Sequence, residues 1–258
     1  MNIVVCVKQV PEIQLVKATD NGLELPSGPG QINPFDAYAL EEALKLKEGQ
    51  GASVSAITVG PDGATAVLRE AASLGVETLY HCNDAAFEGS DPMATARILA
   101  AAVGKIGSAD LIITGKQAVD EDASAVGPAL AGFLNVPQVM FVKKVESIGD
   151  GQAIVHRQTE DGYDVVEVKL PAVISVVKEI NEPRLPSLKG KMQAKKAQIT
   201  TWSASDLGVD ANLVGSNSPS QVLRDAPPAP RPPAEMLDGE PSKVAEELFQ
   251  KLRDAQVI

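Results

Sequence analysis

Three short segments at predicted strand ends and helix starts have residue types that suit a phosphate-bearing ligand. They are residues 33–36, the turn at residues 59–61 and the loop at residues 115–126. A helix N-terminus offers free backbone N–H groups and the positive end of the helix dipole to a phosphate group. Ser124 adds a hydroxyl donor near the last helix start. Together the segments suit an adenine nucleotide, although each alone also fits an ordinary helix cap or turn.

The residue types that most often catalyse reactions or bind metals form no recognisable set. His81 and His156 fall in predicted strands, with no nucleophile motif beside them. Cys6 and Cys82 lie in apolar runs, which favours buried, reduced thiols, and no Cys or His pair has the spacing of zinc ligands. The chain also lacks GxGxxG after its first strand and lacks GxxxxGK[ST]. We therefore expect neither a catalytic residue nor a metal site.

The composition limits the class of protein. Of 258 residues, 44% are hydrophobic and only 3% aromatic, which favours a Val-rich parallel sheet covered by Ala-rich helices. The net charge of −11 argues against a nucleic-acid binder, whose surface would be basic. The N-terminus enters a strand pattern directly, and no stretch is long enough to span a bilayer. We therefore expect a cytoplasmic protein.

Short β-branched runs alternate with helical-period segments from residue 1 to about 145, a pattern typical of βαβ units in a parallel sheet. We predict strands at residues 3–7, 54–59, 78–82 and 110–114. The first helix is predicted to begin at Asn33 and Pro34 and to end at Gly49. The helix after the loop at 115–126 is predicted to turn Phe133 inward, with Val126 and Leu130. Ligands of open α/β sheets bind at strand carboxyl ends, where these loops lie.

The pattern changes in the second half of the chain. Residues 152–170 predict an antiparallel hairpin that turns at residues 160–162, and a buried strand follows. A cation-rich loop covers residues 181–192, and the Pro-rich run at 226–233 must be extended. The last helix, from about residue 242 to 255, has an apolar stripe. We predict a nucleotide-binding domain at 1–205 and an arm at 206–258, and we favour docking of the arm on a partner over folding back.

Several motifs follow one another in a fixed order along the chain. They are VCVKQV at 5–10, NPFD at 33–36, ALEEA at 39–43, GKQAVD at 115–120, LPAVIS at 170–175 and NEPR at 181–184 followed by Ser187 and Leu188. Together they resemble the beta subunit of electron transfer flavoproteins over residues 1 to about 200. Agreement of several motifs in order is more specific than any one of them.

The resemblance implies an α/β protein with a mostly parallel, Rossmann-like sheet of the adenine nucleotide alpha hydrolase type. It implies a heterodimer whose alpha subunit holds a redox FAD, while the beta subunit buries AMP, or a second FAD in electron-bifurcating members. The residues carried over to the nucleotide are Cys6, Asn33, Pro34, Phe35, Asp36, Val59, Gly115, Lys116, Gln117, Ala118, Val119, Asp120, Glu121, Asp122, Ala123, Ser124, Ala125 and Val126.

The resemblance also implies a surface for docking. Leu188 is carried over as the apolar anchor that contacts a flavin dehydrogenase such as an acyl-CoA dehydrogenase, with Arg184, Lys189 and Lys191 around it. An apolar side chain ringed by charge has the make-up of a small interaction hot spot. A solvated basic loop is the alternative. The implied function is electron relay between flavin enzymes, by a carrier subunit and not by a catalyst.

Departures from the family pattern leave the nucleotide open. Glu121 resembles the acidic residue of AMP-binding members, whereas bifurcating members have Gly there, and a Thr and a Gln where this chain has Ser124 and Ala125. The VGP at 126–128 and the KGKM at 189–192 resemble bifurcating members instead. We favour AMP. The alternatives are a bifurcating subunit whose FAD oxidises NADH, and an ATP-binding sensor of the stress-protein type that forms a homodimer.

Overall fold

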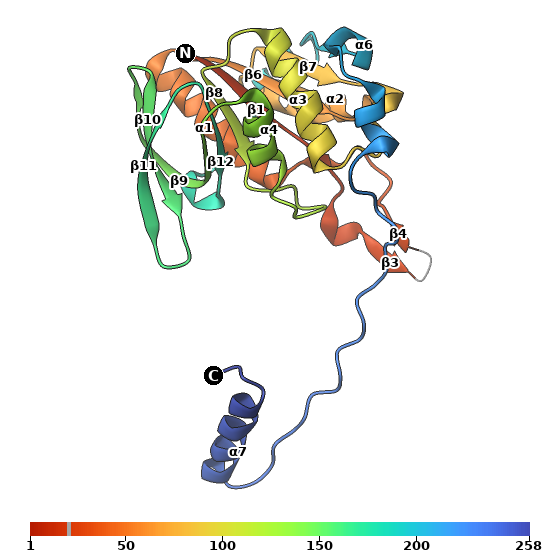
Figure 1. The fold of residues 1–258 in the computed structure, drawn as a ribbon, viewed down its shortest axis with the longest axis vertical. Helices are drawn as coiled ribbons and strands as arrows, with labels where there is room; N and C mark the ends of the chain where they lie inside the picture. Colours follow the sequence, from red (N-terminus) through yellow and green to blue (C-terminus); the bar gives the residue numbers. More distant parts are fainter. Residues whose placement is uncertain (20–21) are drawn as a thin grey trace.

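A nine-stranded sheet forms the centre of the molecule in the computed structural model, which describes residues 1–19 and 22–258 (Figure 1). Its order is β11-β10-β9-β12-β8-β1-β6-β7-β13. Neighbours from β9 to β13 pair in parallel, and β9, β10 and β11 pair antiparallel. The strands are β1 (Asn2–Cys6), β6 (Ser53–Val59), β7 (Thr78–Cys82), β8 (Leu111–Gly115), β9 (Gln138–Gly149), β10 (Gln152–Gln158), β11 (Tyr163–Lys169), β12 (Ala172–Val176) and β13 (Thr200–Trp202).

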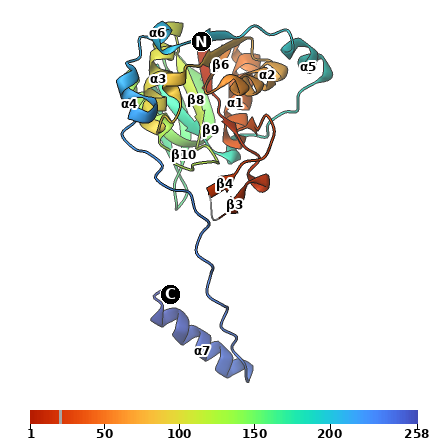
Figure 2. The same cartoon turned by 90° about the vertical axis from the view of Figure 1, so that its right-hand side faces the viewer.

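Helices cover both faces of the sheet. Figure 2 shows α1 and α2 on one side, and α3 and α4 on the other. The helices are α1 (Pro34–Gln50), α2 (Thr65–Leu74), α3 (Pro92–Ile106), α4 (Val126–Leu134), α5 (Leu188–Ala194), α6 (Ala204–Leu207) and α7 (Pro241–Asp254). Two small ribbons, β2 (Gln9–Val10) with β5 (Gln31–Ile32) and β3 (Lys17–Thr19) with β4 (Gly22–Glu24), complete the described strands.

The period-two pattern of the strands builds two cores, one on each face. In β1, Ile3 and Val5 belong to the cluster with α1 and α2, while Val4 and Cys6 belong to the cluster with α3 and α4. All four side chains are buried. Because both faces are covered, the central strands are apolar on both sides, as expected for a parallel sheet. The predicted α/β class with a mostly parallel sheet and an antiparallel hairpin is confirmed.

Three local features of the structure were not predicted. Phe133 lies on the exposed side of α4 with the Arg97 guanidinium 4.6 Å from its ring centroid, because Leu130 and Ala131 cover the sheet instead. Residues 188–194 form a short helix where a loop was predicted, since Ser187 caps it by accepting a hydrogen bond from Gly190 N. The hairpin has a third strand, β9, which the sequence did not indicate.

The end of the chain leaves the body gradually. Ser220 N still donates to the Asp91 carboxylate at 2.9 Å, and Val214 is buried against the α3 side. From residue 221 to 240 the chain is extended, and α7 stands clear of the body in both views (Figures 1 and 2). No residue of α7 is buried. None of the helices within residues 1–19 and 22–258 combines the length and apolar character needed to cross a bilayer.

Candidate functional site

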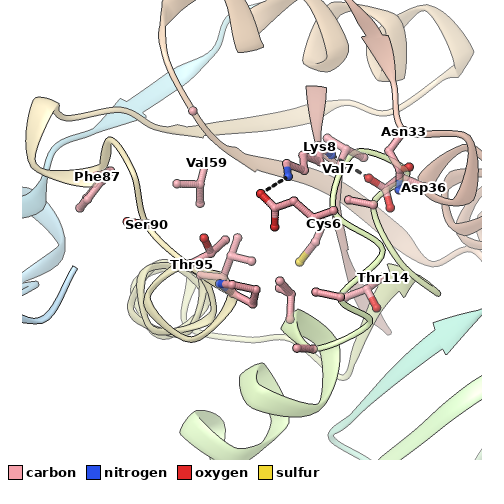
Figure 3. Close-up of a pocket in the computed structure, with 18 of the residues that line it drawn as sticks. Cys6, Val7, Lys8, Asn33, Asp36, Val59, Phe87, Ser90, Thr95 and Thr114 are labelled. Atoms are coloured by element: carbon pink, nitrogen blue, oxygen red, sulfur yellow. Dashed lines mark hydrogen bonds and ion pairs between the residues drawn. The ribbon is translucent and has the colours of Figure 1, made fainter. Parts of the chain in front are cut away.

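A cavity of about 710 Å³ opens at the carboxyl ends of β1, β6 and β8, beside the N-termini of α1, α3 and α4 (Figure 3). Its wall includes the following residues from the predicted nucleotide set: Cys6, Asn33, Asp36, Val59, Gly115, Lys116, Gln117, Ala118, Glu121, Ala123, Ser124, Ala125 and Val126. The structure therefore brings the three predicted segments together around one space. This is the place where ligands of open α/β sheets bind.

The other residues of the predicted set shape the loop and do not line the cavity. Asp120 forms an ion pair with Lys8 Nζ at 2.9 Å, and Asp122 accepts a hydrogen bond from Gln117 Nε2 at 2.6 Å. Val119 N donates to Asn33 Oδ1 at 3.2 Å. Pro34 and Phe35 belong to the first turn of α1.

Part of the cavity wall was missed from the sequence. Residues 83–85 and 87–90, which follow β7, line it together with Lys8, Thr95 and Thr114. The start of α3 at Pro92 is visible in the sequence as an Asp-Pro cap. Because ligands of open α/β sheets bind at strand carboxyl ends, the residues after β7 could also have been predicted as part of the wall.

A buried carboxylate ties the strand ends together. Asp36 Oδ2 accepts a hydrogen bond from Lys8 N at 2.7 Å, and Oδ1 accepts one from Gly115 N at 3.2 Å. A Cβ atom at Gly115 would overlap Asp36 Oδ1 and lie 2.7 Å from the Phe35 carbonyl carbon, so only glycine fits. Burial raises the pKa of Asp36 to about 7, although the two backbone N–H donors oppose this.

The loop after β8 has an unusual backbone conformation. Asp122 and Ser124 both have positive φ angles, 51° and 50°, which few residues other than glycine adopt. Lys8 Nζ holds the loop by ion pairs with Asp120 at 2.9 Å and Glu121 at 3.3 Å. Burial alone would lower the pKa of Lys8, but these two carboxylates outweigh it and hold the pKa above its ordinary value. The amine therefore stays charged at the cavity wall.

Two polar features of the cavity wall have no hydrogen-bond partner among the described residues. Thr114 Oγ1 is buried and has no hydrogen-bond partner. Helix α4, like α1 and α2, begins without a side-chain cap, whereas α3 is capped by Asp91, whose carboxylate accepts from Ala94 N at 2.8 Å. Uncapped N–H groups at a helix start and an unpartnered hydroxyl are what phosphate and ribose oxygens would satisfy. The residues present therefore fit an adenine nucleotide.

The cavity has no reactive thiol. Cys6 lies in its wall and is unpaired, as is Cys82, and both are buried. Burial raises the pKa of both thiols, that of Cys82 to about 12, and the Asp36 carboxylate raises the pKa of Cys6 further. Neutral thiols are poor nucleophiles. Among the described residues no cluster of three or more His, Cys, Asp and Glu side chains is arranged to hold a metal.

The predicted docking residues divide into two groups. Leu188 begins α5 with 78% of its surface exposed, and Lys189 and Lys191 are exposed beside it. The Arg184 side chain turns the other way and binds Glu41 and Glu48 of α1. The structure therefore presents an apolar and basic surface, with Arg184 engaged by its own chain.

The covered parallel sheet with a cavity at its carboxyl edge defines a Rossmann-like α/β protein. The model of the electron transfer flavoprotein domain family matches residues 25–207. Over the full length of both chains, this chain is 41% identical to the caffeyl-CoA reductase-Etf complex subunit CarD of Acetobacterium woodii. It is 39% identical, again over the full length of both chains, to the electron transfer flavoprotein subunit beta of Thermoanaerobacterium thermosaccharolyticum and to that of Clostridium acetobutylicum. The chain belongs to the electron transfer flavoprotein beta subunit family.

Proposed function

We propose that this chain binds AMP in the cavity and forms a heterodimer with an alpha subunit that holds the redox FAD. The observation that carries the proposal is the pair of incomplete polar features in the cavity wall, the uncapped start of α4 and the unpartnered Thr114 hydroxyl. A phosphate at the α4 N-terminus would gain backbone N–H groups and the helix dipole. A ligand hydroxyl would give the Thr114 hydroxyl a hydrogen-bond partner.

In this proposal the chain's own side chains bind and orient, and the flavin supplies the redox chemistry. Cys6, Val59 and Leu99 offer apolar surface to a base, while Lys8 keeps the loop after β8 closed over it. The AMP is unreactive. It stabilises the protein by mass action, because it binds the folded chain only.

The extent of the cavity favours a second candidate, in which a second FAD that oxidises NADH replaces AMP. The wall continues from the loop after β8 to residues 83–90, beyond the segments that the sequence assigned to a mononucleotide. A volume of about 710 Å³ lies in the upper part of the range usual for ligand pockets. A dinucleotide would use both parts of the wall.

The electron donor in this proposal is a flavin dehydrogenase that acts on CoA thioesters, such as an acyl-CoA dehydrogenase, docked on Leu188. The exposure of that side chain and the name of the caffeyl-CoA reductase complex relative support this class of partner. The far end of the predicted arm at 206–258 docks on the alpha subunit through the apolar side of α7, where Leu248 and Phe249 are half exposed, while residues up to 220 stay on the body. The cytoplasmic location stays a prediction.

Counting the nucleotides released from the purified heterodimer tests the proposal. One FAD and one AMP per heterodimer support the AMP-binding carrier, and two FAD without AMP support the second candidate. A flavin-free homodimer with bound ATP would contradict both and favour a stress-protein-type sensor.

A matched pair of threonines tests whether the nucleotide binds in the cavity. Thr114 and Thr58 each bury a hydroxyl without a partner, but only Thr114 lines the cavity. We expect Thr114→Val to lose bound nucleotide on gel filtration, by about tenfold in affinity, the effect of one hydrogen bond of about 1.4 kcal/mol. Thr58→Val should keep it. Equal retention by both variants would place the nucleotide elsewhere.

A further inference from the structure

The segment between β12 and β13 is bound to α1 and α2, and its apolar side chains face solvent. Its apolar side chains Leu185, Leu188 and Met192 are 90%, 78% and 63% exposed. Such a row of exposed apolar residues is costly in water unless a partner covers it. Hydrogen bonds to α1 and α2 hold the segment so that these side chains stay in solvent.

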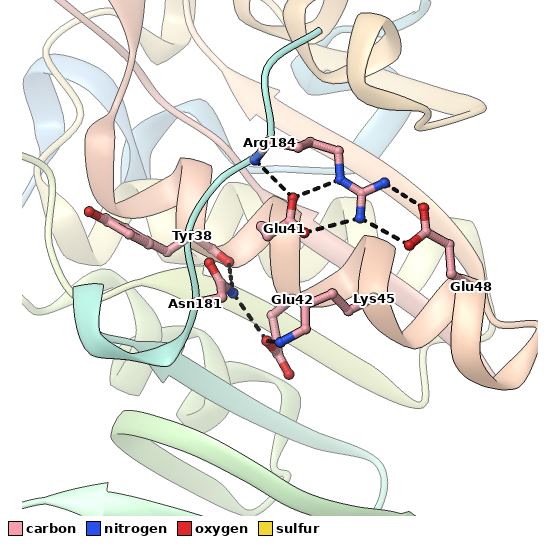
Figure 4. A network of polar contacts seen from close by, with 7 residues as sticks. All are labelled: Tyr38, Glu41, Glu42, Lys45, Glu48, Asn181 and Arg184. Atoms are coloured by element: carbon pink, nitrogen blue, oxygen red, sulfur yellow. Dashed lines mark hydrogen bonds and ion pairs between the residues drawn. The ribbon is translucent and has the colours of Figure 1, made fainter. Parts of the chain in front are cut away.

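At the first end, Arg184 binds two carboxylates of α1 (Figure 4). Its Nε and one terminal nitrogen donate to the two oxygens of Glu41 at 2.8 and 3.0 Å. The same terminal nitrogen donates to Glu48 at 3.0 Å, and the other terminal nitrogen also binds Glu48. The backbone N–H of Arg184 donates to Glu41 at 3.1 Å. Side chain and backbone of one residue are thus fixed together.

Asn181 strengthens this anchor three residues earlier. Its Nδ2 donates to the Tyr38 carbonyl at 3.1 Å and to Glu42 at 3.0 Å. At the other end, Arg69 of α2 donates to the Ala194 carbonyl at 3.0 Å, and Gly190 lies directly against the Ser73 carbonyl. The exposed row therefore bridges α1 and α2.

The anchor at Arg184 differs from an ordinary surface ion pair. Exposed single pairs contribute little to stability, but a guanidinium shared between two carboxylates in a bidentate arrangement is stronger and directional. The Glu41 side chain is only 9% exposed, so it lies beneath Arg184 and away from any docking partner. Arg184 itself is 32% exposed, and most of its N–H donors are already used by its own chain.

We propose that Arg184 is a positioning residue for docking: it pre-organises the segment 185–192 on α1 so that Leu188 is presented to the electron donor. This rests on the proposed function of Leu188 as the anchor. A pre-organised segment loses less conformational entropy when it binds. A segment that adopts the docking conformation for only about a tenth of the time binds about tenfold more weakly.

Electron transfer from an acyl-CoA dehydrogenase, reduced with its acyl-CoA substrate, to the flavin of the heterodimer tests the proposal. We expect Arg184→Gln to raise the KM for the dehydrogenase about tenfold, in line with the population argument, with kcat nearly unchanged. Glu41→Gln should do the same although Glu41 cannot reach the dehydrogenase. The double variant should be no worse than either single variant, because both changes remove one interaction. Arg184→Lys should rescue only in part, since an ammonium cannot bind two carboxylates bidentately.

A second readout separates positioning from direct contact. Hydrogen exchange of the amides at 185–193 should speed up in Arg184→Gln and Glu41→Gln, and should stay as in the wild type in Leu188→Ala. If Arg184 touched the dehydrogenase instead, Glu41→Gln would keep the wild-type KM and exchange rates, and Arg184→Lys would restore docking; that result would overturn the proposal. Should Glu41→Gln fail to assemble, Glu48→Gln breaks the outer half of the same network at an exposed residue.

The Leu188→Ala variant distinguishes a failure of the positioning role of Arg184 from a failure of Leu188 as the docking anchor. If it leaves the KM for the dehydrogenase unchanged, the anchor itself is wrong. If it raises the KM while the Arg184 and Glu41 variants behave as the wild type, the anchor stands and the positioning role falls. Val165→Ala, an exposed apolar residue on edge strand β11, serves as the control and should leave the KM unchanged.

Discussion

Two segments leave the carboxyl ends of the neighbouring strands β8 and β12, and they use this shared position in opposite ways. β8 and β12 are in parallel register, with Gly115 beside Val176. The loop after Gly115 turns inward, and it lines the cavity before α4 begins. The segment after Val176 crosses the outside of α1 to reach α2, and it presents Leu188 to solvent.

One helix supplies the acids that hold both segments. Asp36, in the first turn of α1, binds the Gly115 N–H from within the core. Glu41 and Glu48, further along the same helix, bind Arg184 on the outside. The difference teaches that strand position alone does not decide whether a loop builds a cavity or a docking surface. The two segments differ in the groups that α1 binds: Asp36 binds the backbone of the inward loop, whereas Glu41 and Glu48 bind the Arg184 side chain of the outward segment.

The largest expected effect concerns the inward loop. In Gly115→Ala the new Cβ would overlap Asp36 Oδ1 and crowd the Phe35 backbone, and both have little room to move because they belong to the first turn of α1, where Asp36 is buried. We expect a loss of about 3 kcal/mol in the free energy of unfolding, the upper end for overpacking, and loss of bound nucleotide. Urea denaturation of the full-length protein measures the first.

Gly104→Ala is the matched control. Gly104 lies in α3, where an added Cβ would meet no other atom within 4 Å, so alanine should stabilise by about 0.5–1 kcal/mol through helix propensity. An equal response of the two variants would mean that the close approach at Gly115 does not hold the strand ends together.

The inward region could be predicted well from the sequence because its signals are local. The β-branched runs gave the central strands within about two residues, the usual uncertainty at element ends. The Asn33 and Pro34 start of α1 is where the structure has it. Most of the residues after β8 that the family resemblance assigned to the nucleotide line one cavity at the strand ends, where ligands of open α/β sheets bind, and their binding of a nucleotide stays a prediction.

The outward region could not be predicted to the same depth, because its contacts join residues far apart in the chain. Nothing local to Arg184 indicates that Glu41, 143 positions earlier, receives its side chain. Phe133 has helical spacing with Leu130 yet is partly exposed and contacts the Arg97 guanidinium of α3, a tertiary contact that the spacing does not indicate. The third strand of the hairpin, β9, has alternating exposed and buried residues with a register shift, which blurs the period-two pattern.

The second prediction concerns the pH dependence of stability, and it compares Asp36, whose pKa is raised, with Asp84, whose pKa is lowered. The pKa of Asp36 is about 7 in the folded protein, well above the ordinary value of 3.8, so between these values the folded chain keeps a proton that the unfolded chain releases. Stability must therefore fall as pH rises through this window, by up to about 1.4 kcal/mol per pH unit. The difference in unfolding free energy between wild type and Asp36→Asn, measured from pH 4 to pH 7, should show this slope.

Asp84 gives the opposite sign and serves as the comparison. Backbone N–H groups of Ala86 and Ala204 hold its pKa below the ordinary range, so its contribution is present above the unfolded pKa and is lost as pH falls toward the folded one. Asp84→Asn should therefore change the stability curve only at the acid end. Parallel curves for wild type and Asp36→Asn between pH 4 and pH 7 would show that Asp36 is not held in its protonated form.

The smallest expected effect on stability is that of Gly190→Ala in the outward segment, where an added Cβ would overlap a neighbouring atom as it would at Gly115. A Cβ at Gly190 would overlap the Ser73 carbonyl oxygen and lie 3.1 Å from its carbonyl carbon. Here the surrounding helix is only seven residues long and mostly exposed, so it can lift away from α2. We expect Gly190→Ala to cost less than about 1 kcal/mol in global unfolding, since helix propensity offsets part of the strain, while the amides at 188–194 exchange faster. A loss as large as that of Gly115→Ala would mean that the docking segment is part of the cooperative core, and the contrast between a fixed inward loop and a separately held outward one would fail.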